Sequence, residues 1–587
     1  MEFSLKRSWL VLLVGFLTTS FGASALDIGG IESSKSTSLF NPIDVVSEGA
    51  HIKLSVVGAF RGGMFGDKSP SDSPVYEKKT KRLFIGSQMR SAIEVIDLSD
   101  PSNPTKVDSF DVMPYGGEPN SMAMFRDVLV TLVQDIDDDN VPNQVVFMNP
   151  FGELLTAPIE LMHASKVAFS PNGRKLVVSI VGKANDEYTD DPEGGVAIID
   201  VAPLTRGPCR LSRNASDQSA PPRWWAKKHR CDDPLAVQLL DFKAFNDKED
   251  ELIAAGIRIY GPNASVAQDL EPGDVTISKN SKIAYLSMQP NNAVAVVDIH
   301  KGSIDKLLPL GTIDHSLPGN GFDPSDKDGV INIANWPVKS FSAPSGMQAM
   351  ERWYGRFFVL ANEGDLRDED GFSEEVKVGE MVLDPVAFPN AATLQEDANL
   401  GRLRVTNVNG DADGDGLFEE IFMMGSRSIS IYTAAGERVF HSGDDFEQIT
   451  AQAIPQCFNC PPDANDFDSR SPRKGVEPEH LTTGKVHGRE YVFVALERIG
   501  GIMVYDISNP YAPQFQQYIN NRNFAVDPRD VCGIKGELAL PTCPLAGDLE
   551  PEALVFIPKK DSPIGASLVV VGHESSDSVA VYRVDEL

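Results

Sequence analysis

The chain is poor in cysteine, histidine and positive charge, and each shortage excludes a class of function. Its 587 residues include six cysteines and nine histidines, which are few for a site that holds several zinc ions. Lysine and arginine number 53 against 84 acidic residues, which gives a net charge of −31. Because lysine and arginine bind phosphate backbones, this balance excludes nucleic-acid binding as a main role. The HExxH and GxSxG signatures of zinc proteases and serine hydrolases are also absent.

Long apolar runs are absent after the N-terminus. Residues 9–17 form an apolar stretch behind two basic residues, and a small-residue cleavage site follows at 23–25. This pattern is typical of a secretory signal peptide over residues 1–25, since a membrane span needs about 20 apolar residues. We therefore predict an exported chain, residues 26–587, with no membrane span. Residues 584–587 (VDEL) resemble the K-D-E-L retrieval signal, so retention in the endoplasmic reticulum is the less favoured alternative.

The six cysteines fit an oxidising compartment. Proximity in the sequence suggests the disulfide pairs Cys209–Cys231, Cys457–Cys460 and Cys532–Cys543. Six cysteines allow fifteen connectivities, so other pairings stay open. The Cys-x-x-Cys pair could instead be half of a redox or zinc site, but no second such motif exists. Asn214 and Asn263 each begin an Asn-x-Ser sequence, which is a glycosylation acceptor in an exported protein.

One short strand pattern is repeated along the whole chain. Apolar residues alternate with small or polar ones, and most copies end at a turn-forming residue, in residues 92–101, 145–152, 196–203, 294–301, 429–436, 502–510 and 579–584. Glu-Pro pairs precede further apolar runs at Glu118, Glu271, Glu477 and Glu550, which gives units of three ordered strands. Ordered repetition of this kind predicts an all-β fold, a seven-bladed β-propeller. A β-sandwich whose strands merely look alike is the alternative.

The length of the repeat predicts one propeller domain with long loop insertions. Seven repeats over residues 26–587 allow about 80 residues each, whereas a usual propeller repeat has about 40–50. The surplus lies in three segments without strand patterning, near residues 206–234, 365–401 and 451–475.

Residues 407–420, NVNGDADGDGLFEE, form the strongest single motif. Acidic residues at alternate positions, separated by glycine, supply the hard oxygen ligands that calcium needs. The EF-hand pattern gives a first set of ligands, Asn409, Asp411, Asp413 and Glu420. A register two residues later gives a second set, Asp411, Asp413, Asp415, Glu419 and the backbone carbonyl of Leu417. Strand-like flanks favour the second set, as in strand–loop–strand calcium sites of propeller blades, and a metal-free acidic turn is the alternative.

A ring of carboxylates is predicted at one mouth of the channel. In a propeller blade, the start of the first strand and the end of the second lie on the same face. The carboxylates expected there are Glu118, Asp135, Glu271, Glu363, Glu477, Glu497, Glu550 and Glu574. Such charges repel unless a cation or an arginine neutralises them, and Arg367, Arg498 and Arg522 are close in sequence. Alternatively, the Glu-Pro glutamates cap backbone N–H groups at blade junctions.

Several long stretches resemble the choice-of-anchor I family, among them residues 361–378, 407–422, 495–510 and 547–563. That family includes mesenchyme-specific cell-surface glycoproteins, and some relatives carry the label of atypical alkaline phosphatase. The resemblance extends from about residue 50 to the end of the chain. It implies an extracellular seven-bladed propeller of the YVTN/nitrite-reductase-like kind, with links to biomineral formation in animals and to phosphate scavenging in microbes.

Two functions follow from these features. The first is a secreted calcium-binding propeller glycoprotein that binds a divalent cation, mineral or an extracellular partner. The alternative is a calcium-dependent alkaline phosphatase that hydrolyses phosphate esters. In that case Arg498 and Arg522 would clamp phosphate oxygens, and His480 or His573 would act as a general acid. The catalytic residues are not fixed by the sequence, and the candidates are Glu497, Arg498, His573 and Glu574.

Overall fold

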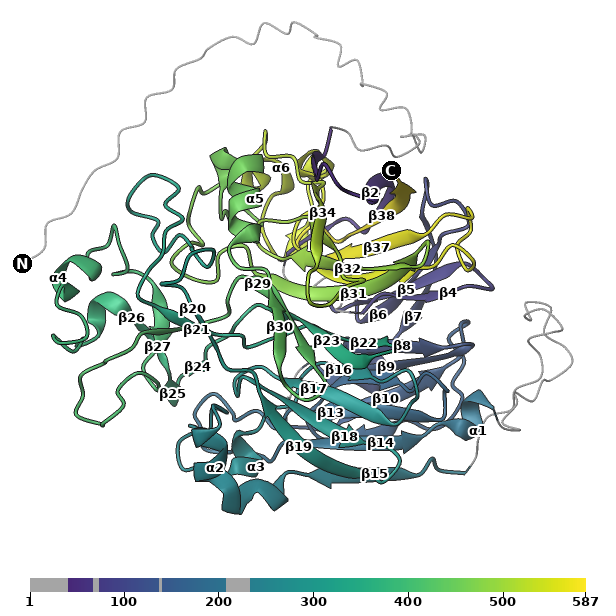
Figure 1. The fold of residues 1–587 in the computed structure, drawn as a ribbon. Helices are drawn as coiled ribbons and strands as arrows, with labels where there is room; N and C mark the ends of the chain where they lie inside the picture. The colour runs from purple at the N-terminus through teal and green to yellow at the C-terminus, as the bar shows by residue number, and fades with distance from the viewer. Residues whose placement is uncertain (1–40, 67–72, 137–139, 207–232) are drawn as a thin grey trace, which may run out of the picture. The chain divides into compact units, whose positions relative to one another are not determined.

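The computed structural model describes residues 41–66, 73–136, 140–206 and 233–587, and antiparallel sheets dominate it (Figure 1). The predicted signal peptide, Cys209, Cys231 and Asn214 lie outside the described residues. Seven of the sheets contain four or five strands each, and the others are smaller.

The first four large sheets are each built from four consecutive strands. The first contains β4 (Val75–Glu77), β5 (Arg82–Ser87), β6 (Ala92–Asp97) and β7 (Thr105–Asp111). The second contains β8 (Gly117–Phe125), β9 (Val128–Asp135), β10 (Asn143–Met148) and β11 (Ile159–Leu161). The third contains β12 (Ala164–Phe169), β13 (Lys175–Ile180), β14 (Gly195–Asp200) and β15 (Val237–Asp241). The fourth contains β16 (Val275–Ile277), β17 (Ile283–Met288), β18 (Ala293–Asp298) and β19 (Ser303–Pro309).

The last three large sheets depart from this simple order. The fifth contains β22 (Met347–Arg352), β23 (Gly355–Asn362), β29 (Ser428–Thr433) and β30 (Arg438–His441), with a long insertion between β23 and β29. The sixth contains β31 (Pro478–Val486), β32 (Arg489–Leu496), β33 (Ile502–Asp506), β34 (Gln514–Asn520) and the early strand β1 (Ile43–Val46). The seventh contains β36 (Pro551–Ile557), β37 (Leu568–His573), β38 (Ser578–Glu586) and the early strand β2 (Ile52–Arg61).

The first strands of these sheets contact one another in a closed cycle. The contacts run in the order β4, β8, β12, β16, β22, β31 and β36, and β36 in turn contacts β4. Apolar clusters fill the space between neighbouring sheets, and one of them packs Leu83 and Ile85 against Leu568 and Val570. Face-packed antiparallel sheets in cyclic order form a β-propeller. The predicted all-β propeller is confirmed, and the number of blades stays a prediction.

The repeated sequence pattern corresponds to the third strand of each large sheet, namely β6, β10, β14, β18, β29, β33 and β38. These strands lie between two others, so their apolar side chains are buried against the neighbouring sheets. The aspartate that ends several of them closes a turn. The Asp97 carboxylate accepts the Ser99 N–H at 2.8 Å, and the Asp298 carboxylate accepts the His300 N–H at 3.0 Å. The polar stop in the sequence therefore has the turn role predicted for it.

The insertion between β23 and β29 has an apolar core of its own. Its elements are β24 (Asp368–Glu369), β25 (Phe372–Ser373), β26 (Glu375–Lys377), α4 (Ala391–Leu394), β27 (Arg404–Thr406) and β28 (Phe422–Met424). Leu400, Val405 and Ile421 are among the residues that form the core. Strand β28 pairs in parallel with β21 (Lys339–Phe341), which pairs with β20 (Thr312–Asp314). The insertion is thereby joined to the segment that follows the fourth sheet.

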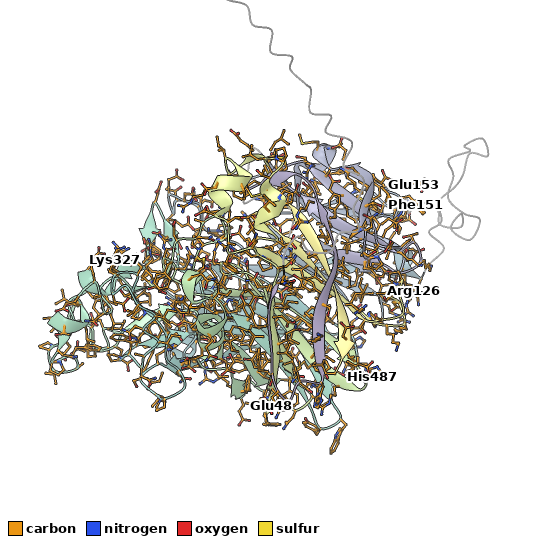
Figure 2. The ribbon with its side chains drawn as sticks, turned by 90° about the horizontal axis from the view of Figure 1, so that it is seen from above. Glu48, Arg126, Phe151, Glu153, Lys327 and His487 are labelled. Atoms are coloured by element: carbon orange, nitrogen blue, oxygen red, sulfur yellow. A yellow bond between two sulfur atoms is a disulfide. The ribbon has the colours of Figure 1, made fainter. Side chains whose placement is uncertain are left out.

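Helices are short and lie in the connections between strands (Figure 1). Besides α4, they are α1 (Ala202–Thr205), α2 (Glu249–Ala254), α3 (Val266–Asp269), α5 (Asp445–Ala453) and α6 (Pro528–Cys532). Figure 2 shows the described side chains, with the exposed residues Lys327 and His487 toward the outside of that view. In the part of the chain that is described, no helix has both the length and the apolar character needed to span a membrane.

Candidate functional site

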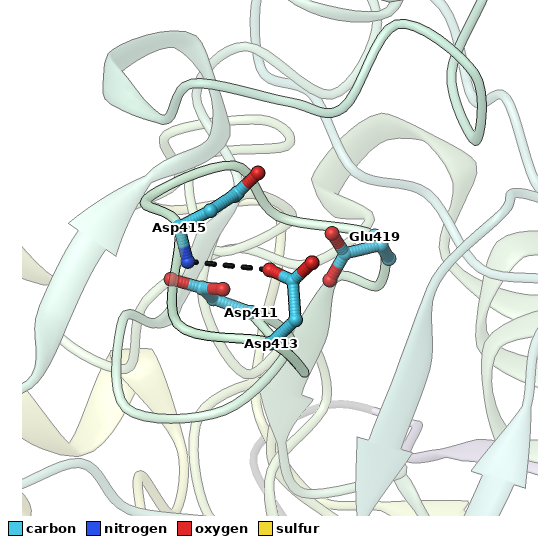
Figure 3. A group of neighbouring side chains, drawn as sticks. All are labelled: Asp411, Asp413, Asp415 and Glu419. Carbon is cyan, nitrogen blue, oxygen red and sulfur yellow. Dashed lines mark hydrogen bonds between the residues drawn. The ribbon is translucent and has the colours of Figure 1, made fainter.

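Four acidic side chains of the 407–420 loop lie close together (Figure 3). One carboxylate oxygen from each of four residues lies within 4.8 Å of the others, those of Asp411, Asp413, Asp415 and Glu419. Oxygens at this spacing can be bound by a single ion. These four residues are the side-chain ligands of the second predicted register.

Backbone N–H groups of the loop hold these carboxylates in place. The Asp411 carboxylate accepts the Gly414 and Gly416 N–H groups at 2.8 and 2.9 Å. The Glu419 carboxylate accepts the Ala412 N–H at 2.9 Å. Both glycines have positive φ, and a Cβ at either position would meet nothing within 4 Å. The backbone conformation therefore explains why glycine is found at these two positions, because residues with a side chain rarely adopt positive φ.

The two residues specific to the first register are held by other partners. The Asn409 side-chain oxygen accepts the Arg258 Nε–H at 2.9 Å, and Glu420 forms an ion pair with Lys339. Both interactions lie at the ends of the loop and connect it to neighbouring segments. The structure therefore assembles the second set of side chains and separates Asn409 and Glu420 from it.

The donor set of the loop fits calcium. It consists of carboxylate oxygens alone, which are the hard ligands that calcium takes, and it contains no nitrogen or sulfur donor that would favour zinc. Among the described residues, none of the four acids forms an ion pair with a lysine or arginine. Their mutual repulsion is thus left without an internal counter-charge.

A second acidic group forms where first strands begin and second strands end. Carboxylate oxygens of Glu363, Glu479 and Glu497 lie within 4.8 Å of one another. Glu363 follows β23 directly, Glu479 is the second residue of β31, and Glu497 follows β32. The predicted gathering of strand-end carboxylates thus occurs for part of the set, and Glu479 joins it unpredicted.

Basic side chains neutralise most of this second group. The Lys474 ammonium lies 2.7 Å from carboxylate oxygens of both Glu363 and Glu477. Arg498 lies 2.6 Å from Glu497 and 3.2 Å from Glu477, and it also pairs with Glu550. Two carboxylates of this group, those of Glu363 and Glu497, therefore each have a protein cation as counter-charge.

The protonation of these acids reflects burial and their partners. Burial disfavours the ionised form of Glu477, but Lys474, Arg470 and Arg498 outweigh it and the pKa of Glu477 is lowered. Burial, followed by the charges of Glu479 and Glu477, raises the pKa of Glu497 well above its usual value. Glu477 is thus held in its ionised form, whereas the neighbouring Glu497 is able to keep a proton.

Arg367 organises a separate acidic pair near the start of β16. Its guanidinium lies 2.6 Å from carboxylate oxygens of both Asp269 and Glu271. Burial raises the pKa of Glu271 to about 7, while Arg367 acts in the opposite direction. The ring predicted from the Glu-Pro starts is therefore divided, with Glu271 held by Arg367 and Glu477 and Glu550 held by Arg498.

The remaining candidates lie at strand ends in other surroundings. Glu118 and Asp135 belong to the paired strands β8 and β9. His573 ends β37 and is buried, and this burial lowers its pKa to about 4. Glu574 follows His573, and its N–H donates to the Glu550 carbonyl at 2.7 Å.

Arg522 does not meet the acidic group in the predicted way. Its guanidinium donates to the carbonyls of Pro461 and Ala464 at 2.8 and 2.7 Å, and to the Asn465 side chain at 2.9 Å. These bonds hold a buried arginine against the 451–475 insertion. Arg522 therefore has a structural role and not the phosphate-binding role considered for it.

Sequence reasoning missed a pocket lined by basic residues. Its volume is about 280 Å³, and its basic lining consists of Arg404, Arg470, Arg473, Lys474 and Arg498, with the acids Asp365, Asp368 and Glu375. Among the described residues, Arg473 has no ion-pair partner, and burial, Arg404 and Arg470 lower its pKa. Three of the basic residues lie at 470–474, just before the Glu-Pro pair that begins at Glu477. This short basic cluster is the signal in the sequence that could have located the pocket.

The described cysteines and one glycosylation acceptor can be placed. Disulfides join Cys457 to Cys460 and Cys532 to Cys543, as proximity suggested. Asn263 is exposed in a turn before α3 and is accessible to a glycan. The final tetrapeptide begins inside β38, which extends to Glu586.

Comparisons with solved structures give only weak likenesses. Sqt1 of Saccharomyces cerevisiae is 9% identical with a TM-score of 0.40, over 90% of this chain and 98% of that one. The hydrazine synthase of Kuenenia stuttgartiensis is 11% identical with a TM-score of 0.37, over 92% of this chain and 98% of that one. Similarity at this level carries no argument about function.

Sequence comparisons give a clearer assignment. The mesenchyme-specific cell surface glycoprotein of Strongylocentrotus purpuratus is 29% identical over 283 residues, which cover 42% of this chain and 36% of that protein. Gigasin-3a of Magallana gigas is 28% identical over 198 residues, which cover 33% of this chain and 67% of that protein. The alignment thus spans little more than a third of the first relative. The choice-of-anchor I domain matches residues 73–510, which is most of the sequence, and the chain therefore belongs to the choice-of-anchor I domain family.

Proposed function

We propose that this protein is an extracellular β-propeller glycoprotein that binds calcium through residues 411–419. The observation that carries the proposal is that oxygens of four carboxylates lie within 4.8 Å of one another, and that no lysine or arginine in the described part of the chain pairs with them. The cell-surface name of one relative, the two disulfides and the accessible Asn263 support an extracellular location.

The second acidic group is less suited to a calcium ion than the loop is. At the strand ends, Lys474 and Arg498 already balance the glutamates. A calcium ion there would compete with two protein cations, whereas in the loop it would relieve unopposed repulsion. The loop is therefore the better place for a calcium ion.

The position of the loop suggests a role in binding. It is exposed and belongs to an insertion on a rigid set of sheets, an arrangement in which loops commonly carry recognition. An ordered calcium site would fix the shape of this insertion and present it to mineral or to an extracellular partner. Calcium would thus act as a structural ion in a binding surface.

Calorimetric titration of the chelator-treated protein with calcium tests this proposal. We expect binding in the range of about 0.1–1 mM, typical of extracellular calcium modules, and its loss in Asp413→Ala. Asp250→Ala is the matched control, because it removes an exposed acid from α2, outside the loop. Unchanged calcium binding by Asp413→Ala would refute the assignment.

The basic pocket favours a second candidate function, hydrolysis of phosphate monoesters. Arg473 pairs with no carboxylate in the part of the chain that the structure describes, and it could bind a phosphate oxygen with Arg404 or Arg470. Arg498, which also lines the pocket, contacts Glu497, whose raised pKa suits a general acid. In such a reaction water attacks phosphorus, the ester P–O bond breaks, and Glu497 protonates the leaving oxygen.

Turnover of p-nitrophenyl phosphate with calcium or with chelator separates the two candidates. Calcium-dependent turnover that is lost in Glu497→Gln and retained in the exposed control Glu437→Gln would support the phosphatase. Calcium binding without turnover would leave the binding protein as the function.

A further inference from the structure

The turns that join the first strand of each large sheet to the second are rich in basic residues. With two flanking residues on either side, these segments are residues 76–83, 124–129, 168–176, 276–284, 351–356, 485–490 and 556–569. They contain fifteen lysines and arginines and five acidic residues, whereas the whole chain has 53 and 84. The sign of the charge is therefore reversed in these turns, and every one of them contributes at least one basic residue.

Contacts between successive turns place them beside one another around the propeller. The rings of Phe125 and Phe169, which flank the turns of the second and third sheets, have centroids 6.0 Å apart. The Asn172 N–H donates to the Ser281 hydroxyl at 2.9 Å, which joins the turn of the third sheet to that of the fourth. These three turns therefore lie on one face.

The fourth, fifth and sixth sheets continue the same face. The Lys279 N–H donates to the Glu351 carboxylate at 3.0 Å, which joins the turn of the fourth sheet to that of the fifth. The Arg352 guanidinium donates to the Glu490 carboxylate at 2.6 Å, which joins the fifth sheet to the sixth. Both contacts link segments that belong to different sheets, so the alignment of the turns comes from the packing of the sheets.

The seventh and first sheets meet in the same way. The Tyr76 hydroxyl donates to the Asp561 carbonyl at 3.2 Å. Figure 2 shows Arg126 and His487, from two of these turns, on the right of that view, and Lys327 on the left. The second acidic group lies at the opposite ends of the strands, where first strands begin and second strands end. We call the face that the seven segments form the basic face.

Part of the charge on the basic face has no acidic partner. Lys78 pairs with Asp561 at 3.2 Å, which brings the turn of the first sheet against that of the seventh. Lys282, Lys559 and Lys560 are exposed, and within the described ranges they form no ion pair. Exposed charges of one sign on one face attract a ligand of the opposite sign.

Exposed aromatic side chains lie on the basic face as well. Trp353 and Tyr354 form the turn between β22 and β23 and are 95% and 45% exposed, and Tyr511, which follows β33, is 56% exposed. The Tyr354 ring has its centroid 5.3 Å from that of Trp353 and 5.9 Å from that of Phe357. The Phe357 ring in turn lies 5.8 Å from that of Tyr511. Large aromatic groups left open to solvent in one patch mark a binding surface.

We propose that the basic face binds an acidic polysaccharide, a chain of sugars that carries sulfate or carboxylate groups. The lysines and arginines of the turns would hold the anionic groups, and Trp353, Tyr354 and Tyr511 would pack against the apolar faces of the sugar rings. A long chain can contact several turns at once, and this raises its affinity without any single strong contact. In the extracellular location proposed above, such chains are commoner polyanions than nucleic acid. The binding needs no calcium.

Surface plasmon resonance in the presence of chelator, with immobilised heparin, hyaluronan and uncharged dextran, tests the proposal. Heparin carries sulfate and carboxylate groups and hyaluronan carries carboxylate groups alone, so the two arms distinguish the anion. We expect binding to at least one of them and none to dextran, with an affinity that falls as salt is added. Absence of binding to both acidic chains would overturn the proposal, whatever the outcome of the calcium titrations.

The variant Lys559→Gln/Lys560→Gln tests the basic residues. It should bind the acidic chain more weakly, and the slope of log Kd against log salt concentration should fall by about two, because two fewer counterions are displaced. The matched control is Lys243→Gln/Lys248→Gln, which removes two exposed lysines from η2 (Lys243–Lys248), outside these turns. Equal affinities of the two double variants would contradict the proposal.

Trp353→Ala tests the contact with the sugar rings. Because Trp353 is almost wholly exposed, its removal should leave the melting temperature unchanged. We expect binding of the acidic chain to weaken about tenfold, with the salt slope unchanged, since the lost contact is not ionic. Unchanged affinity of Trp353→Ala would overturn the polysaccharide as the ligand. Equally tight binding of double-stranded DNA would do the same, since a duplex offers the charge without open sugar faces.

Discussion

The ammonium of Lys474 lies 2.7 Å from the carboxylate of Glu363. The first residue lies at the end of the 451–475 insertion and the second directly follows β23, so the contact joins segments far apart in the sequence. A carboxylate that would otherwise be buried without a counter-charge is neutralised by the protein itself.

Lys474→Met should destabilise the protein, because it leaves the carboxylates of Glu363 and Glu477 without their shared ammonium. Removal of one partner from a buried ion pair costs about 3 kcal/mol. Urea unfolding would measure the loss, with Lys560→Met as an exposed control that should change stability by less than about 0.5 kcal/mol. Equal stability of the two variants would contradict the role assigned to Lys474.

Glu419→Gln and Glu420→Gln form a matched pair that separates the two registers of the calcium loop. Glu419 converges with the three aspartates, whereas Glu420 pairs with Lys339. We expect Glu419→Gln to weaken calcium binding about tenfold, the effect of one lost charged ligand worth about 1.4 kcal/mol. Glu420→Gln should bind calcium as the parent does. Calorimetry that shows weaker calcium binding by Glu420→Gln and unchanged binding by Glu419→Gln would instead favour the EF-hand register.

The buried His573 should make the protein sensitive to acid. Its pKa is about 4 in the folded protein, below the usual value of 6.5, because burial disfavours the imidazolium. Its contribution to stability is therefore complete above pH 6.5 and is lost as the pH falls through 4, up to about 3 kcal/mol. Denaturant unfolding of His573→Asn should show a smaller loss between pH 7 and 4, and the exposed control His300→Asn should follow the parent. Identical pH profiles for His573→Asn and the parent would contradict this.

Replacement of Cys532 and Cys543 by serine should lower stability, because the disulfide closes a loop with a sequence separation of 11 residues. Restriction of the unfolded chain by a loop of this length is worth about 3 kcal/mol. Melting temperature under non-reducing conditions would measure the loss. A reducing agent should lower the melting temperature of the parent more than that of the variant, which retains only the Cys457–Cys460 disulfide of the two in the described residues.

The parts of the structure that could be predicted from sequence are those with local patterning. All seven repeated segments are third strands, because apolar alternation and a turn-forming stop are properties of a few consecutive residues. The 411–419 cluster was predictable for the same reason, since its ligands lie within one loop.

Contacts between distant insertions could not be predicted. Nothing local indicates that Lys474 meets Glu363. These insertions have no periodic apolar pattern, so their paths are set by tertiary packing and by ion pairs. The Cys457–Cys460 disulfide and the bonds from Arg522 fix one of them in place.

The pairing of β2 with β38 has a consequence for biosynthesis. Leu54 lies opposite Val584, and the Leu587 N–H donates to the His51 carbonyl at 3.1 Å. The seventh sheet thus joins an early strand of the chain to a much later one. Until β38 has been made, β2 lacks the strand with which it pairs, and its open edge must be kept from pairing with another molecule. The seventh sheet is therefore completed late in synthesis, and truncation after residue 577 would leave β2 and β37 without the strand that joins them.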